Sequence, residues 1–345
     1  MLMVIFGAGA SYDSDARRPV SGPQSASRPP LTEHLIDERH RRIANEYPAS
    51  ISVIDYVEQN LADDTPSSLE TILAQYAARA DSSSACRQAL VAFRFYLCRL
   101  ITNATDQWLR ETHGLTIYLS LLNQLLEWQE TSGERVQLVT FNYDMLLEDA
   151  AARVIPDWRI NTFGDYISRP DWGLLKPHGS VGWSRVASLA DDGRGEPNST
   201  RALTSANLAH TENLPLRALN ATHITSTDNG DVLLPAIAVP LANKTTFECE
   251  DIQVEAFKST IPEIRRLLVC GWRAAEAHAI QILQDIYPGF YLGIVTSSQA
   301  DLKEVQENLG DVFGRGKLVL AETGGMSAFA KDMKQSLAPL LVLWD

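Results

Sequence analysis

Residues 2–11 have the sequence LMVIFGAGAS, in which an apolar run passes directly into a turn of small residues. A short apolar run stopped by glycine is typical of a buried parallel strand, which we expect over 2–6. Small residues in such a turn let backbone N–H groups approach a pyrophosphate, and a helix that begins there adds its positive end. An ordinary strand-to-loop turn is the alternative interpretation of this motif by itself.

The residues after the turn disfavour an ordinary dehydrogenase. The usual dinucleotide fingerprint has a third glycine or alanine and, about twenty positions on, an acidic residue that binds the ribose. Glu33 is nearest to that position, but it lies among polar residues that are typical of a helix surface. We therefore expect a nucleotide site of a different kind.

The rest of the chain alternates between short apolar runs and segments with helical periodicity. We expect further strands over 136–140, 174–176, 232–234, 267–270, 291–296 and 317–320, and helices over 252–264, 275–286 and 302–309, with a last helix after Gly325. This alternation predicts an α/β fold, a Rossmann-like parallel sheet with helices on both faces. Residues 31–130 show only helical periodicity, which predicts a helical insert between the two parts of a Rossmann-like domain, 1–30 and 131–345. The polar segment 188–230 is expected to be a loop.

The charge balance and the cysteines exclude several classes of protein. With 30 basic and 43 acidic residues the net charge is −13, which argues against direct nucleic-acid binding because that needs clustered Lys and Arg. The four cysteines contain no CxxC pair, so neither a disulfide framework nor a thiolate zinc site is expected. No signal peptide and no stretch long enough to span a membrane is visible, so we expect a cytoplasmic protein without membrane contact.

Two polar side chains stand where predicted strands end. Asn142 lies within TFNYD at 140–144, and His178 lies within KPHGS at 176–180. Open parallel sheets bind ligands at the carboxyl edge of their strands, so both side chains can project into one crevice with the glycine turn. Taken alone, an Asn at such a junction is most often a helix N-cap, and a His beside Gly is most often a turn residue.

The blocks GAGAS at 7–11, TFNYD at 140–144, KPHGS at 176–180 and VCGW at 269–272 occur in an order that resembles SIR2-like proteins, and more specifically the SIR2-like NADases of bacterial anti-phage defence. In that family the first block cradles the NAD pyrophosphate, and the resemblance makes Asn142 and His178 the catalytic pair. The strand before VTSS at 295–298 lies where the family contacts the adenosine end. The residues that we expect to bind NAD are Gly7, Ala8, Gly9, Ala10, Ser11, Thr140, Asp144, Gly271, Thr296 and Ser297.

Cleavage of NAD suits these side chains. Nicotinamide leaves as a neutral molecule, so its departure needs no general acid, unlike that of most sugar leaving groups. Asn142 can hold the water or the ribose hydroxyls without adding negative charge, and His178 can act as a base near neutral pH. Ser11 and Thr140 are expected to donate hydrogen bonds to phosphate or ribose, and Asp144 is expected to cap the following helix or orient Asn142. No metal is expected.

The chain also departs from the family. It lacks the four-cysteine zinc module of the deacylating sirtuins and an evident acyl-lysine channel motif, which disfavours deacylation, and Trp272 replaces a small hydroxyl residue in the block beside the adenosine pocket. We therefore expect an NAD glycohydrolase that acts in anti-phage defence by depleting NAD. A sensor that binds NAD or ADP-ribose without turnover and an NAD-dependent protein deacylase are the alternatives. The resemblance implies control by homo-oligomerisation or by a partner, either a short prokaryotic Argonaute or a HerA-type ATPase.

Overall fold

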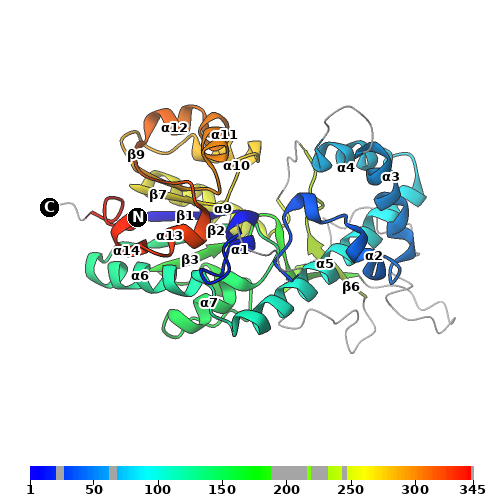
Figure 1. The fold of residues 1–345 in the computed structure, drawn as a ribbon, viewed down its shortest axis with the longest axis horizontal. Coiled ribbons are helices and arrows are strands. Elements are labelled where there is room, and N and C mark those ends of the chain that lie inside the picture. Colours follow the sequence, from blue (N-terminus) through cyan, green and yellow to red (C-terminus); the bar gives the residue numbers. More distant parts are fainter. Residues whose placement is uncertain (21–26, 62–67, 188–215, 219–231, 243–246, 343–345) are drawn as a thin grey trace. The chain divides into compact units, whose positions relative to one another are not determined.

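The computed structural model describes residues 1–20, 27–61, 68–187, 216–218, 232–242 and 247–342 (Figure 1). By its internal contacts the chain divides into two compact units. The first comprises Met1–Pro29, Ala104–His178 and Lys244–Asp345, and the second comprises Pro30–Asn103 and Gly179–Asn243.

A six-stranded sheet forms the centre of the first unit. Its order is β3-β2-β1-β7-β8-β9, and all neighbouring strands are parallel. The strands are β1 (Leu2–Phe6), β2 (Val136–Thr140), β3 (Trp172–Leu175), β7 (Arg266–Cys270), β8 (Tyr291–Val295) and β9 (Lys317–Glu322). The predicted α/β fold with a parallel sheet is confirmed, and these six strands match their predicted positions closely.

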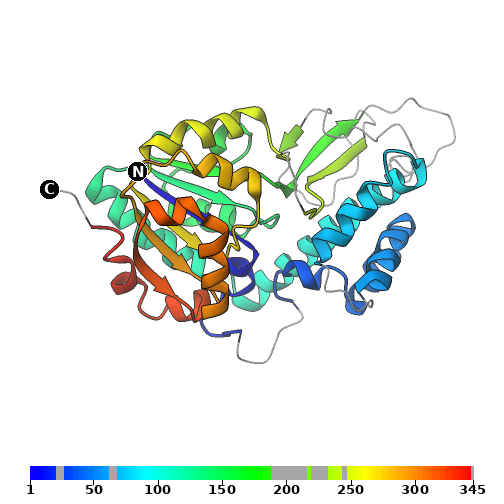
Figure 2. The same cartoon turned by 90° about the horizontal axis from the view of Figure 1, so that it is seen from above.

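Helices cover both faces of this sheet, as Figures 1 and 2 show. Met3 and Ile5 of β1 belong to an apolar core that includes residues of the helices on one face, whereas Phe6 packs against Tyr118 on the other, with ring centroids 5.3 Å apart. This alternation follows from the two-residue period of a strand. The helices of the unit are α1 (Ala8–Tyr12), α6 (Ile117–Ser132), α7 (Leu146–Val154), α9 (Asp251–Thr260), α10 (Ala277–Leu283), α11 (Gln299–Leu309), α12 (Asp311–Arg315), α13 (Gly325–Phe329) and α14 (Met333–Leu337).

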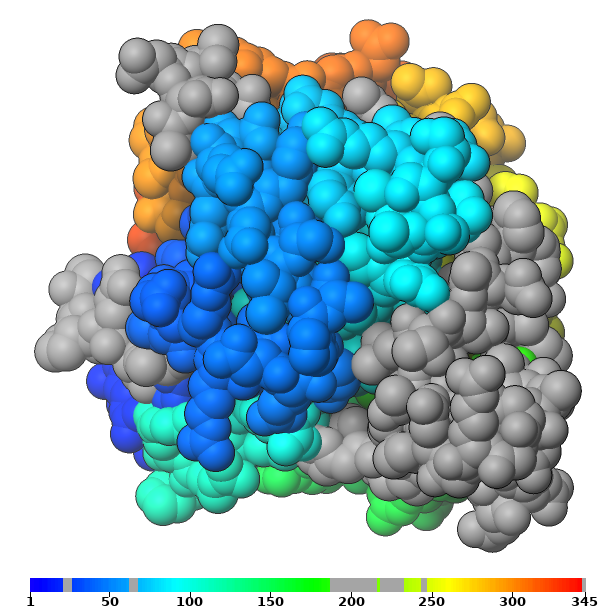
Figure 3. Space-filling view, turned by 90° about the vertical axis from the view of Figure 1, so that its right-hand side faces the viewer, coloured from blue at the N-terminus to red at the C-terminus, as the bar shows by residue number. Residues whose placement is uncertain are grey.

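The second unit combines helices with a small antiparallel sheet. Figure 3 shows its helical segments, coloured blue to cyan, side by side on one face. The helices are α2 (Arg41–Ala44), α3 (Ile51–Leu61), α4 (Leu69–Ala77) and the first part of α5 (Ser84–Thr112), and the strands, in sheet order, are β5 (Leu216–Ala218), β4 (Gly179–Ala187) and β6 (Val232–Ile237). In the part of the chain that the structure describes, no helix is long and apolar enough to cross a membrane.

Two expectations about organisation differ from the structure. The expected insert comprises 31–130, whereas the second unit comprises Pro30–Asn103 and Gly179–Asn243. Residues 104–130, which include most of α6, belong with the parallel sheet. The prediction that 232–234 adds a strand to the parallel sheet is wrong, because β6 pairs antiparallel with β4. Glycine and serine interrupt the apolar pattern of β4, so the sequence offers no clear signal for the strand with which β6 pairs. The expected loop over 188–230 lies outside the described residues except for β5.

Candidate functional site

The strand register brings distant segments of the first unit to one edge of the parallel sheet. Phe6 pairs with Thr140 on one side and with Cys270 on the other, and Cys270 pairs with Val295. The strands β1, β2, β7 and β8 therefore end level with one another, and the residues that follow them share the carboxyl edge. The sheet order runs outward in both directions from β1, and open α/β sheets bind ligands at such a position.

Gly7 and Gly9 face Gly271 at this edge. A Cβ on Gly7 would lie 2.6 Å from the carbonyl oxygen of Gly271 and equally close to the Cα of Trp272. A Cβ on Gly271, whose φ is +57°, would lie 2.3 Å from the backbone nitrogen of Ala10. Backbone atoms this close leave no room for a side chain. The contact between the two segments therefore requires these glycines, whereas the sequence motif suggests only a ligand as the reason for the first two.

The same contact occupies part of the hydrogen-bonding capacity of the turn. The amides of Gly7 and Gly9 donate to the carbonyls of Cys270 and Gly271 at 3.0 and 3.1 Å, and the Ala10 amide donates to the Gly7 carbonyl within the turn at 2.9 Å. At most the amides of Ala8 and Ser11 are left for a phosphate, so the turn can offer only a smaller cradle than the motif predicts.

Asn142 is anchored to this turn by its amide nitrogen. Nδ2 donates to the carbonyl oxygen of Gly7 at 3.0 Å and to Oγ of Ser11 at 2.9 Å, and the side chain is buried. Among the described residues no group donates to the buried Oδ1. A buried amide oxygen without a donor is costly, and a ligand hydroxyl or a water can satisfy it. The arrangement assigns the nitrogen of Asn142 to the fold and leaves the oxygen as an acceptor.

Tyr118 of α6 completes this hydrogen-bonded group, and the sequence analysis did not identify it. Its hydroxyl lies 2.9 Å from Oγ of Ser11 and 3.4 Å from Nδ2 of Asn142. Burial raises the pKa of the Tyr118 phenol well above its ordinary value, so it stays protonated. Ser11 and Tyr118 are 107 residues apart, and no local pattern in the sequence relates them.

His178 lies beside the chain neighbours of Asn142. Its ring centroid is 4.9 Å from that of Phe141 and 6.4 Å from that of Tyr143, and the residue is only 8% exposed. His178 therefore lies beside the segment that carries Asn142, in contact with the side chains of the two residues that flank it.

Further rings extend this neighbourhood. Phe141 stacks on Trp272 at 5.0 Å with an interplanar angle of 12°, and the rings of His178 and His278 are 5.9 Å apart. Trp272 Nε1 donates to Glu276 Oε2 at 2.6 Å. Aromatic faces attract flat cationic rings.

Within the described residues no group of three or more His, Cys, Asp or Glu side chains could hold a metal ion.

The other predicted site residues make local hydrogen bonds. Thr140 Oγ1 accepts from the amide of Asn142 at 3.1 Å, and Asp144 Oδ1 accepts from the first amide of α7 at 3.0 Å. Asp144 therefore caps the following helix, one of its two expected roles. Thr296 Oγ1 donates to the carbonyl of Ser298 at 3.1 Å, and Ser297 Oγ bonds Asp301 in the first turn of α11.

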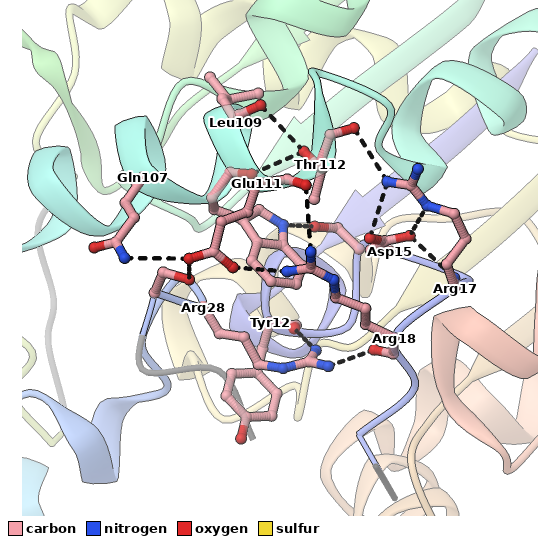
Figure 4. A network of polar contacts seen from close by, with 12 residues as sticks. Tyr12, Asp15, Arg17, Arg18, Arg28, Gln107, Leu109, Glu111 and Thr112 are labelled. Atoms are coloured by element: carbon pink, nitrogen blue, oxygen red, sulfur yellow. Dashed lines mark hydrogen bonds and ion pairs between the residues drawn. The ribbon is translucent and has the colours of Figure 1, made fainter. Parts of the chain in front are cut away.

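The loop after the glycine turn is held by arginines (Figure 4). The Arg28 guanidinium is buried, lies 5.1 Å from the Trp108 ring centroid, and donates to the backbone carbonyls of Tyr12 and Arg18. Arg18 in turn pairs with Glu111 at 2.6 Å. These cations are engaged with the chain itself.

Comparisons with known proteins find only distant structural likenesses. No family model and no curated protein matches the chain. A Sir2 homologue in complex with NAD superposes with a TM-score of 0.42 at 12% identity, covering 99% of this chain and 90% of that one. A mutant Sir2 homologue in complex with ADP-ribose gives 0.40 at 12%, covering 98% and 93%. Sir2 bound to an inhibitor, 2′-O-acetyl-ADP-ribose and a deacetylated p53 peptide gives 0.38 at 11%, covering 97% and 93%.

Proposed function

We propose that this protein is a SIR2-like NAD glycohydrolase that cleaves NAD to nicotinamide and ADP-ribose. The observation that supports this function best is the anchoring of Asn142. Its amide nitrogen bonds the glycine turn more than 130 residues away in the chain, its oxygen accepts from no described group, and His178 contacts the residues on either side of it.

The proposed reaction follows from what these groups can do. Oδ1 of Asn142 accepts a hydrogen bond from a ribose hydroxyl or from the attacking water. The bond between ribose C1′ and nicotinamide breaks, and its electron pair leaves with the ring nitrogen. The water oxygen adds to C1′ while His178 takes its proton, a contribution typically of about 10²–10⁴-fold. The positively charged nicotinamide ring would lie among the aromatic rings around His178.

The remaining predicted residues would bind the rest of NAD. The amides of Ala8 and Ser11 would donate to the pyrophosphate, and Thr296 and Ser297 lie at the edge where the adenosine end would bind. Thr140 and Asp144 would act through Asn142 and through the start of α7, because they accept hydrogen bonds from the backbone amides there.

The proposed biological role rests on the family resemblance and on charge. An enzyme that depletes NAD must be inactive until it is triggered, so we propose control by self-association or by a partner, a short prokaryotic Argonaute or a HerA-type ATPase. The net charge of −13 suits a cytoplasmic chain that leaves nucleic-acid contact to its partner.

The test is incubation of the purified protein with NAD, alone and with the product of a neighbouring gene, followed by separation of nicotinamide and ADP-ribose. We expect equal amounts of both products, and their loss in Asn142→Ala and His178→Ala. Asn123→Ala, on the exposed side of α6, is the control and should retain full activity. Tight ADP-ribose binding without nicotinamide release under any activating condition would establish the sensor instead. Release that depends on an acyl-lysine peptide and yields no free ADP-ribose would establish the deacylase.

A further inference from the structure

A buried lysine in the segment that carries His178 bonds the segment that carries Asn142. The side chain of Lys176 is completely buried and that of Glu148 is 5% exposed, with Nζ 2.7 Å from Oε1. Nζ also donates to the backbone carbonyl of Asp144 at 2.5 Å. One ammonium group thus bonds a residue of α7 and the loop that leads into it.

The contact of Lys176 with Asp144 joins the two segments that carry the proposed catalytic residues. Lys176 precedes His178 by two residues, and Asp144 follows Asn142 by two residues. The ammonium therefore connects the segment that ends in the imidazole with the segment that presents the amide. Its surroundings are held as well, because the Lys176 amide donates to Gln253 Oε1 at 3.0 Å.

Stability alone does not account for this pair. Moving two charges out of water costs about as much as their attraction returns, so well-packed apolar residues of similar volume often stabilise a core equally well. Burial accordingly raises the pKa of the Glu148 carboxyl, against the opposing effect of Lys176. A hydrogen-bonded ion pair fixes the direction and the distance between its two groups, whereas an apolar pair does not.

We propose that Lys176 and Glu148 are positioning residues that set the separation between Asn142 and His178. This inference rests on the proposed function, because it concerns the alignment of the base and the acceptor around the reacting C1′. Errors of about 1 Å in such an alignment can cost about 10²-fold in rate.

The fold contains a matched control. Arg266 is also completely buried and pairs with Glu134, Nη1 to Oε1 at 2.7 Å, although Glu134 is 27% exposed and also bonds the Met1 ammonium. Arg266 begins β7 and Cys270 ends it, so this second pair lies at the opposite edge of the sheet, about 13 Å from the carboxyl edge at strand spacing.

The experiment compares two double variants, Lys176→Met with Glu148→Leu, and Arg266→Met with Glu134→Leu. For the first we expect a kcat for nicotinamide release about 10- to 100-fold lower, with a KM for NAD and an ADP-ribose affinity near those of the parent. For the second we expect the parent kcat, whatever its unfolding temperature. If the first double variant does not fold, Glu148→Gln is used instead. It keeps an acceptor for the lysine but loses the charge that shortens and strengthens the bond, so kcat should still be lower with an unchanged KM. A parent kcat in the first pair, or an equal kcat loss in both pairs, would overturn the proposal.

A second readout separates this inference from the proposed function. If the parent protein releases no nicotinamide, the NADase proposal fails, but the alignment can still be observed in the ring ¹³C and ¹⁵N NMR shifts of His178. These shifts should move in Lys176→Met with Glu148→Leu and stay unchanged in the control pair. Unmoved shifts in both would overturn the inference.

Discussion

Replacing Asn142 by Asp tests which end of its amide faces the glycine turn. The substitution preserves the shape of the side chain and the Oδ1 acceptor, but it exchanges Nδ2 for a second oxygen. That oxygen would lie 3.0 Å from the carbonyl oxygen of Gly7, where the amide now donates. Two acceptors at this separation repel each other, so the variant should lose stability even though its volume is unchanged.

The size of the loss follows from the bonds involved. The hydrogen bond to the Gly7 carbonyl is worth about 0.5–1.5 kcal/mol, and a buried oxygen left facing another acceptor costs about 1–3 kcal/mol more. The Ser11 hydroxyl can turn to donate to the new oxygen, so that contact need not be lost. The expected decrease in unfolding free energy is therefore about 1.5–4.5 kcal/mol at pH 7, a large part of the 5–15 kcal/mol typical of a domain. Burial would raise the pKa of the new carboxyl, and its protonated form can donate again. The loss should consequently shrink as the pH falls towards 4.

The assay is urea unfolding of the parent and the variant at pH 7 and pH 4.5. Asn123→Asp is the control, because Asn123 Nδ2 also donates to a carbonyl oxygen, at 2.8 Å, but on an exposed helix surface. It should lose less than about 1 kcal/mol. A loss below about 1 kcal/mol in Asn142→Asp at pH 7 would show that the amide oxygen faces the turn, and would refute the assignment of Oδ1 to a ligand.

Three further outcomes follow from the first unit. Gly7→Ala should lower the free energy of unfolding in urea by about 3 kcal/mol, the upper end for overpacking, because its Cβ meets rigid backbone. Gly314→Ala, whose Cβ meets no atom within 4 Å, should be neutral or slightly stabilising. Equal effects of the two substitutions would contradict the packing argument. Burial raises the pKa of Asp13 above 3.8, so its stabilising contribution is complete below that value and declines as the pH rises through the raised pKa. The parent should therefore exceed Asp13→Asn in unfolding free energy by more at pH 4 than at pH 7. A difference between the two proteins that does not depend on pH would refute this prediction. Arg28→Lys should lower the free energy of unfolding by about 2–3 kcal/mol, since a single ammonium cannot replace a guanidinium that bonds two carbonyls and stacks on a ring. The control is Arg17→Lys, because the Arg17 side chain is half exposed. An equally small change in both variants would contradict this prediction.

The sequence predicts the parallel sheet well because its strands are buried on both faces. Such strands appear as short apolar runs whatever their neighbours are, so β1, β2 and β7 can be located without knowledge of their pairing. The carboxyl edge then follows from topology, because parallel strands in register end together. The proximity of Asn142 to the glycine turn could be predicted for this reason.

The parts that the sequence does not predict depend on contacts between distant segments. Tyr118 looks like any core tyrosine of an amphipathic helix, and its importance to Ser11 appears only when α6 lies on the sheet. The reason for glycine at Gly271 is the close approach of the first turn, which no local pattern encodes. In the same way, the apolar run of β6 fits a parallel or an antiparallel sheet equally well, and only its pairing with β4 decides between them.

The central place of β1 has a consequence for biosynthesis. This strand is made before both of its partners, which lie 134 and 264 residues further along the chain, as the pairs of Leu2 with Val136 and Arg266 show. At ribosomal speeds of about 5–20 residues per second, the second partner emerges on the order of tens of seconds later. Until β2 emerges this fully apolar segment has no strand to pair with, and until β7 emerges one of its two edges stays open. A chaperone, or early collapse around the helices made in between, would protect it during that time.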